Sequence, residues 1–176
     1  MKDGGGGDNL AIAWTYPGQT REVIPARFSR VANPFEIEEF RTTGAILDTW
    51  TGISFGYDIS SLKRDTNNFA YAPRNSVRLV DSLEGPTNVG DNYGSRMRGW
   101  LVPPVTGNFV FWIASDDNGE FWLSTNNRKA NEALICLQPQ SAGPRQWDKY
   151  TEQKSQPIRL VAGQAYYYEV RGSLCV

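Results

Sequence analysis

Apolar residues occur along this chain in short alternating runs that are closed by turn residues. The most strand-like run covers residues 109–114, directly after a turn at Thr106-Gly107-Asn108, and the run 96–102 places every second residue on one face. The same pattern predicts further strands at 10–14, 77–83, 120–123, 158–161 and 164–171. Because no segment keeps a helical period for long, we predict an all-β protein. At this length a two-sheet antiparallel β-sandwich is favoured over a closed barrel.

Three connecting segments affect how these strands are joined. Ala162-Gly163 separates two of the predicted strands by a short turn, which is the pattern of a β-hairpin. Asp117-Asn118-Gly119 follows the strand 109–114 and is also typical of a hairpin end. The stretch 31–40 contains Pro34 and several glutamates without a clear period, and we interpret it as a linker or a short helix.

Composition and charge exclude several classes of function. The chain has 18 lysines and arginines against 19 aspartates and glutamates, and the resulting net charge of −1 excludes the basic surface expected of a nucleic-acid-binding protein. It has no run of about 18 apolar residues, so no membrane insertion is predicted. Histidine is absent, which removes imidazole from any catalytic or metal site. Cys136 and Cys175 are compatible with one disulfide or with two separate thiols.

Asp116 and Asp117 are the first candidates for metal binding, because they end an apolar run and lead into a turn that contains glycine. On an extended trans backbone, neighbouring side chains point to opposite sides. Both carboxylates can therefore hold one ion only if the backbone bends sharply or the peptide bond is cis. Ca²⁺ would suit such a pair, since it takes oxygen ligands in a flexible shell. From the spacing alone, a solvated turn is the favoured interpretation.

A second candidate is the glycine run at residues 4–7, which is followed by Asp8 and Asn9. Four glycines leave the backbone carbonyls bare, so that they can approach an ion or a sugar closely, and Asp8 and Asn9 add side-chain oxygens. Composition by itself favours a flexible terminal linker. The run is not a phosphate-binding loop, because no Lys-Ser or Lys-Thr pair follows it.

Several motifs of this chain occur together in one known family. The most specific combines a Gly-Trp-Leu strand at 99–101, a Thr-Gly turn at 106–107 and an aromatic strand that ends at Asp116-Asp117. Supporting motifs are Trp50-Thr51-Gly52-Ile53, Gly90-Asp91-Asn92-Tyr93-Gly94-Ser95-Arg96, Trp147-Asp148-Lys149-Tyr150 and Leu160-Val161-Ala162-Gly163-Gln164. Together they resemble the anthrax-protective-antigen-type domain, also called the PA-fourteen domain. This resemblance implies a β-sandwich of the kind found in adhesins, flocculins, glycosidases and toxins.

The resemblance also implies a calcium site, which reverses the interpretation from spacing alone. In the glycan-binding branch of the family the Asp-Asp pair is joined by a cis peptide bond and holds Ca²⁺, which in turn binds sugar hydroxyls. Carried over, the metal ligands are Asp116 and Asp117, with Asp8 and Asn9 as secondary ligands. Loop residues Asn118 and Asn127 are expected to hydrogen-bond the sugar.

The order of the motifs differs from that of the family. The segment 4–14 resembles the strand that closes the domain, yet here it precedes the rest. We therefore divide the chain into a closing-strand segment at 1–31, a linker at 32–44 and a main body at 45–176. Three explanations are open, namely a fragment of a tandem array, a circular permutation and a strand that completes a neighbouring chain. Of these we expect donation to a neighbouring chain rather than pairing with the tyrosine-rich strand 166–170 of the same chain.

These features favour a non-enzymatic, calcium-dependent glycan-binding module of an adhesin. An extracellular or cell-surface location is implied by the resemblance. The alternative is a structural repeat or filament subunit that self-assembles by donating its N-terminal strand. An enzyme is a third and weaker hypothesis, since no catalytic constellation is visible. Trp112 and Trp122 lie on predicted strands, where burial in the core is expected.

Overall fold

The computed structural model describes residues 9–31, 43–51, 76–88, 90 and 93–174, and this part of the chain is all-β, as predicted. It contains three single-turn 3₁₀ helices, namely η1 (Ala26–Phe28), η2 (Lys129–Asn131) and η3 (Thr151–Gln153). The strands in chain order are β1 (Asn9–Tyr16), β2 (Gln19–Val23), β3 (Ser29–Arg30), β4 (Ala45–Thr51), β5 (Ser76–Val80), β6 (Tyr93–Leu101), β7 (Gly107–Asp116), β8 (Asn118–Ser124), β9 (Glu132–Gln138), β10 (Ile158–Leu160) and β11 (Tyr166–Leu174). No helix in these residues is long and apolar enough to cross a membrane.

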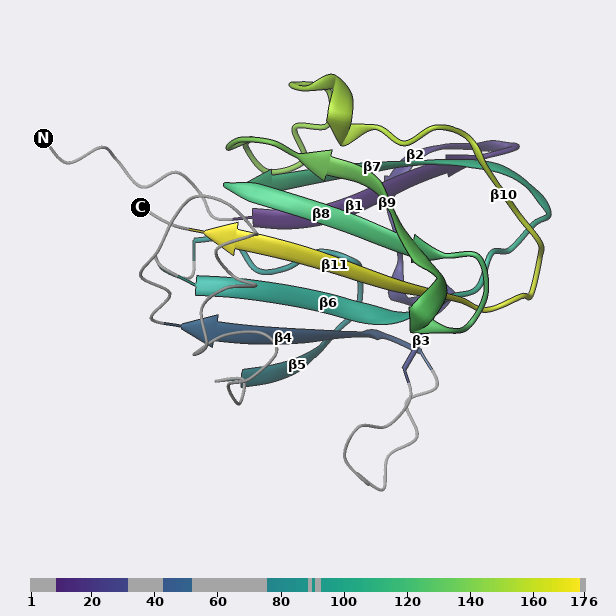
Figure 1. The fold of residues 1–176 in the computed structure, drawn as a ribbon, viewed down its shortest axis with the longest axis horizontal. Coiled ribbons are helices and arrows are strands. Elements are labelled where there is room, and N and C mark those ends of the chain that lie inside the picture. Colours follow the sequence, from purple (N-terminus) through teal and green to yellow (C-terminus); the bar gives the residue numbers. More distant parts are fainter. Residues whose placement is uncertain (1–8, 32–42, 52–75, 89, 91–92, 175–176) are drawn as a thin grey trace, which may run out of the picture.

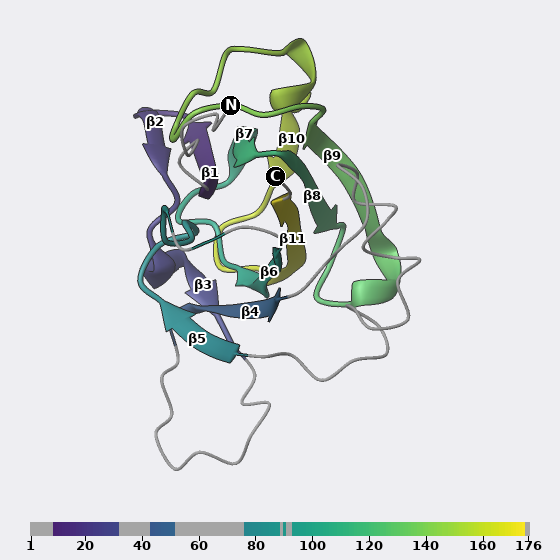
Figure 2. The same cartoon turned by 90° about the vertical axis from the view of Figure 1, so that its left-hand side faces the viewer.

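The strands form two antiparallel sheets that pack face to face, which confirms the predicted sandwich. The smaller sheet has the order β10-β7-β1-β2. The larger has the order β5-β4-β6-β11-β8-β9, with β3 added to β6. Figure 1 looks onto the outer face of the larger sheet, and Figure 2 looks at the end of the sandwich where β1 begins and β7 ends.

The core lies between the sheets and is built from alternate residues of each strand. The predicted inward face of β6, which carries Met97, Gly99 and Leu101, is buried. From the other sheet, β1 contributes Trp14, which is fully buried. Its ring centroid lies 5.3 Å from that of Phe109. Aromatic rings in such contacts bury a large area each, so this cluster contributes strongly to the stability of the sandwich.

The N-terminal strand β1 lies in the middle of the smaller sheet of its own chain. It pairs with β7 from Asn9↔Asp116 to Thr15↔Val110, and on its other side with β2. This differs from the expected donation to a neighbouring chain, and the partner is not the tyrosine-rich strand β11, which belongs to the opposite sheet. Pairing within its own chain is what a circular permutation requires, and that explanation stays a prediction. A long connection makes closure within one chain cheap in entropy, and the apolar face of β1 is buried there.

The predicted hairpin at Ala162-Gly163 is wrong. Its two strands belong to different sheets, since β10 pairs with β7 whereas β11 pairs with β6 and β8. Gly163 does adopt a positive φ of 74°, so the predicted turn forms at this position although it does not join two paired strands. The turn leads the chain from the smaller sheet to the larger one. Each of the two strands pairs in the sheet in which its apolar face is buried.

Two further sequence features concern segments that the structure describes only in part. Cys136 is a free, buried thiol on β9, and burial raises its pKa far above the ordinary value. Cys175 lies outside the described residues, as does most of the stretch 31–40 that we interpreted as a linker or a short helix.

Candidate functional site

The Asp116-Asp117 pair lies where the chain passes from the smaller sheet to the larger one. Asp116 is the last residue of β7, and β8 begins in the opposite sheet at Asn118, so this segment is a crossing and not the hairpin end suggested by its turn residues. The peptide bond between the two aspartates is cis. Gly119 is required here by close packing, because a Cβ at this position would lie 2.8 Å from Ile113 Cδ1.

Strand pairing brings Asn9 next to this pair. Asn9 is the first residue of β1 and lies opposite Asp116 in the ladder. Its side chain is buried, and its Nδ2 donates a hydrogen bond of 2.9 Å to the carbonyl of Ala142. Ala142 is held in turn, since its amide donates to the carbonyl of Ser115 over 3.0 Å. The Asn9 amide is therefore fixed beside the end of β7 by two strands and one loop.

The other predicted site residues lie at different distances from this pair. Asn118 directly follows the aspartates and is half-buried. Asp8 lies outside the described residues. Asn127 is exposed beyond the other end of β8, where its carbonyl accepts a hydrogen bond of 2.9 Å from Trp100 Nε1. A strand of seven residues spans about 20 Å, so Asn127 is not brought to the Asp116-Asp117 pair.

The donor chemistry at this end of the sandwich fits a hard cation. Asp116, Asp117 and Asn9 supply only oxygen atoms as ligands, which suits Ca²⁺ and not Zn²⁺. In the described ranges no group of three or more acidic, histidine or cysteine side chains is placed to hold a metal ion. A calcium ion here would therefore need amide, backbone or ligand oxygens in addition to the two carboxylates.

The two tryptophans expected in the core differ in burial. Trp112 is 7% exposed, as expected, and lies on β7 with Arg21 and Lys154 over its ring. Trp122 is half-buried on the outer face of the larger sheet, where Arg171 lies over its ring at 5.0 Å. Neither residue lies at the Asp116-Asp117 end of the fold, because Trp112 is four residues before Asp116 and Trp122 is near the far end of β8.

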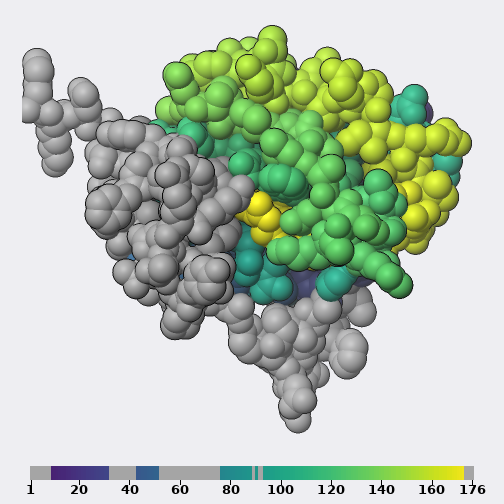
Figure 3. Space-filling view, in the orientation of Figure 1, coloured from purple at the N-terminus to yellow at the C-terminus, as the bar shows by residue number. Residues whose placement is uncertain are grey.

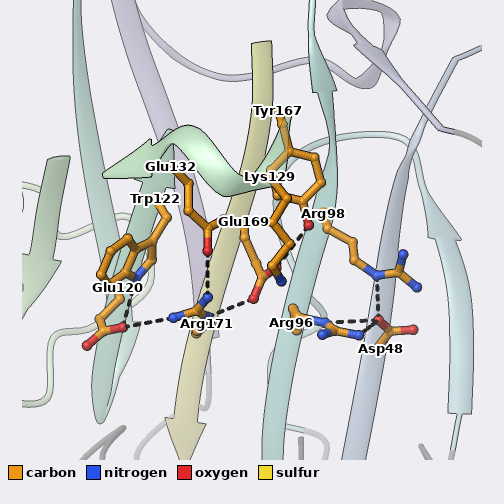
Figure 4. A network of polar contacts seen from close by, with 10 residues as sticks. All are labelled: Asp48, Arg96, Arg98, Glu120, Trp122, Lys129, Glu132, Tyr167, Glu169 and Arg171. Carbon is orange, nitrogen blue, oxygen red and sulfur yellow. Dashed lines mark hydrogen bonds and ion pairs between the residues drawn. The ribbon is translucent and has the colours of Figure 1, made fainter. Parts of the chain in front are cut away.

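Trp122 belongs to a network of charged residues on the outer face of the larger sheet (Figure 4). On β11, Glu169 is 1% exposed and contacts Lys129 at 2.6 Å and Arg171 at 2.7 Å. Arg171 also contacts Glu132 at 3.2 Å. Burial, and then the nearby Glu169 carboxylate, raise the pKa of Glu132, against the effect of Lys129 and Arg171. In the space-filling view of Figure 3, the yellow atoms of β11 lie recessed beside the green segments of β8 and β9.

A second branch of this network is centred on Asp48 of β4. Its carboxylate is fully buried and is contacted at 2.8 Å by Arg96 and at 2.9 Å by Arg98 of the neighbouring strand β6. The acids and bases of the network pair with one another, either within β11, between strands or with η2. The network is therefore explained by stabilisation of the fold and needs no ligand. It is therefore not a candidate site.

Two features were not predicted from the sequence. One is the loop contact at Ala142, and the other is a polar cluster between the sheets that is formed by Thr49, Ser76 and Ser95. Ala142 carries no chemical signal, because it acts through its backbone. The cluster did leave a signal, since alternation along β6 places Ser95 on the same inward face as Met97 and Leu101. A serine at an inward position of an otherwise apolar face is the pattern that points to it.

Comparison with known proteins identifies the family. The family model described as the PA14 domain matches residues 53–171, which is more than half of the chain, so the chain belongs to the PA14 domain family. Strands β1 to β4 precede the matched range, yet β1 and β4 pair with strands inside it.

Two known proteins are similar to this chain. A mouse protein named N-acetyl-beta-glucosaminyl-glycoprotein 4-beta-N-acetylgalactosaminyltransferase 1 is 29% identical over 161 residues, which are 88% of this chain and 15% of that protein. The chain thus spans less than a sixth of that relative. Among solved structures, the Epithelial Adhesin 6 A domain from Candida glabrata, in complex with Galb1-3GlcNAc, has 14% identity and a TM-score of 0.46. That comparison covers 88% of this chain and 81% of the adhesin chain.

Proposed function

We propose that this PA14 domain is a calcium-dependent carbohydrate-binding module, with Asp116 and Asp117 as the main metal ligands. The observation that carries the proposal is the placement of Asn9. The family resemblance assigns two distant segments to the metal, and the pairing of β1 with β7 brings the described end of one, Asn9, opposite Asp116 in the other. Asp8, the residue before Asn9, is retained as a further ligand.

The chemistry of binding follows from these oxygen donors. Calcium accepts six to eight oxygen ligands, more than two carboxylates and one amide supply. The remaining positions would be filled by backbone oxygens, water and sugar hydroxyls, and exchange of water for hydroxyls makes binding depend on the metal. Asn118 follows the aspartates directly and is proposed to hydrogen-bond the sugar, whereas Asn127 is left out because it lies beyond the other end of β8.

The proposed module binds and does not catalyse. The mouse relative is named as a glycosyltransferase, but the chain corresponds to only 15% of it. In a protein of that kind, this domain would hold a glycan near a catalytic part located elsewhere. We place the domain outside the cell or at its surface, where calcium is abundant enough for a site with few charged ligands. Strand donation is not part of the proposal, because β1 already fills its own sheet.

The Asp116→Asn/Asp117→Asn double variant is expected to lower calcium affinity at least about tenfold and to abolish glycan binding, because both charges of the metal site are lost. Isothermal titration with Ca²⁺, followed by a glycan array with and without EDTA, measures both effects. Asp81→Asn is the matched control, since Asp81 is an exposed aspartate outside the site, and it should behave as the wild type.

Glycan binding that persists in EDTA, or in the double variant, would contradict the calcium mechanism. An Asn9→Ala variant adds a further test, because it removes the amide oxygen opposite Asp116. If Asn9 ligates the metal, this variant binds calcium more weakly than the wild type.

A further inference from the structure

A cavity of about 170 Å³ lies between the two sheets at the same end of the sandwich as Asp116. Its walls come from the ends of β4, β5 and β6, the start of β1 and the segment around Gly85. Leu10 of β1 forms part of the wall, and the residue before it, Asn9, is paired with Asp116. The cavity and the proposed metal site are therefore separated by a single strand end.

The inward faces of β4, β5 and β6 change from apolar to polar at this cavity. Thr49 is paired with both Ser76 and Ser95, and all three residues line the cavity. Ser95 is 4% exposed, and its buried hydroxyl has no hydrogen-bond partner in the structure. A buried hydroxyl without a partner costs free energy, so its presence next to an open space points to a ligand that satisfies it.

One cation accompanies these hydroxyls. Arg78 of the edge strand β5 is an exposed residue that lines the cavity, and within the described part of the chain it has no ion-pair partner. It lies opposite Leu47 in the ladder, so it occupies an inward position of the sheet. Aspartate and glutamate are absent from the described residues of the lining. The cavity thus offers hydrogen-bond donors and a positive charge without a negative one, which suits an anionic ligand rich in acceptors.

The size and the apolar walls limit the ligand further. A cavity of about 150 Å³ lined by apolar residues admits benzene, so this cavity has room for one six-membered ring. Leu10, Pro86 and Tyr93 supply apolar contacts, and the hydroxyls supply polar ones. A pyranose has both kinds of surface, with C–H groups on its faces and hydroxyls at its edge.

We infer that this cavity is a second subsite, which takes an acidic pyranose through Ser95 and Arg78 and does not require calcium. The carboxylate of a uronic acid or the sulfate of a sulfated sugar would face Arg78, while a ring substituent accepts a hydrogen bond from Ser95. That the ligand is a sugar rests on the proposed function. The preference for an anion rests on the cavity alone.

The test is an NMR titration of the whole chain in EDTA and low salt with D-glucuronate, D-glucose 6-sulfate, D-glucose and inorganic sulfate. The two acidic sugars should bind about fivefold more tightly than glucose and shift the amide signals of Ser95 and Arg78. Arg78→Gln should remove this preference, and Ser95→Ala should weaken the binding of the acidic sugars about threefold. Arg159→Gln is the matched control, because it removes an exposed arginine from β10.

Equal binding of glucose and glucuronate would overturn the inference, as would a response of Arg78→Gln that matches Arg159→Gln. Inorganic sulfate that binds as tightly as the sulfated sugar would also overturn it, since the site would then hold an adventitious ion only. The titrations omit calcium, so they should give the same result in the Asp116→Asn/Asp117→Asn variant. Failure of the calcium site and failure of this subsite are therefore distinguished.

Discussion

Replacing Trp14 by alanine is expected to lower the free energy of unfolding by about 4 kcal/mol. Trp14 is fully buried on β1, and its ring contacts those of Phe28, Phe109 and Phe111. Its Nε1 also donates to Glu22 over 3.3 Å. The substitution removes the largest side chain of the core and leaves a cavity between the sheets. Urea denaturation followed by circular dichroism measures the change.

Trp147→Ala is the matched control, because Trp147 is half-buried in a loop. It should cost about 1 kcal/mol. A second measurement tests where β1 lies in solution. If β1 fills its own sheet, light scattering across a dilution series shows a monomer for the wild type. Equal effects of the two substitutions, or a wild type that dissociates on dilution with loss of structure, would contradict the placement of β1.

Strands β1, β5, β6, β7, β8, β10 and β11 could be predicted from the sequence, because each contains a short apolar run bounded by turn residues. Strands β2, β3, β4 and β9 were not predicted. The inward face of β6 was predicted correctly to the residue, since Met97, Gly99 and Leu101 lie at every second position. Strand partners were not predictable in this way. The turn at Ala162-Gly163 is compatible with a hairpin and with a crossing between sheets, and only burial of the distant strands decides which one forms. The partner of β1 was missed for the same reason.

Part of the proposed site could also be predicted. Asp116-Asp117 was found through a motif that is specific because it joins a strand, a turn and an aromatic strand. The separation of Asn127 from this pair could have been predicted as well. Successive antiparallel strands run in opposite directions, so a loop after β8 lies at the other end of the sandwich from the loop after β7. Alternation along β6 points to Ser95 itself, but the polar cluster around it depends on the register of three strands, which the sequence alone does not give.

The charged network on the outer face gives the second large effect. Glu169 is opposite Arg98 in the ladder and accepts hydrogen bonds from Lys129, Arg171 and the Tyr167 hydroxyl. Burial by itself would raise the pKa of this carboxyl, but Arg171 and Lys129 outweigh burial and lower it from 4.5 to about 2. A carboxyl whose pKa is lower in the folded chain stabilises that chain above the ordinary pKa. This stabilisation is lost as the pH falls from about 4.5 towards 2.

Glu169→Gln is therefore expected to lower the free energy of unfolding by about 3 kcal/mol at neutral pH. Between pH 6 and pH 3 the wild type should lose about 2 kcal/mol more than the variant, because only the wild type loses the contribution of this carboxylate. Glu132 acts in the opposite direction, since its raised pKa favours the folded chain at low pH, and removing the Glu169 charge weakens that effect. Urea denaturation at several pH values measures both slopes. Glu152→Gln, at an exposed glutamate, should keep the wild-type slope, and the same slope in Glu169→Gln would show that the network does not hold Glu169 ionised.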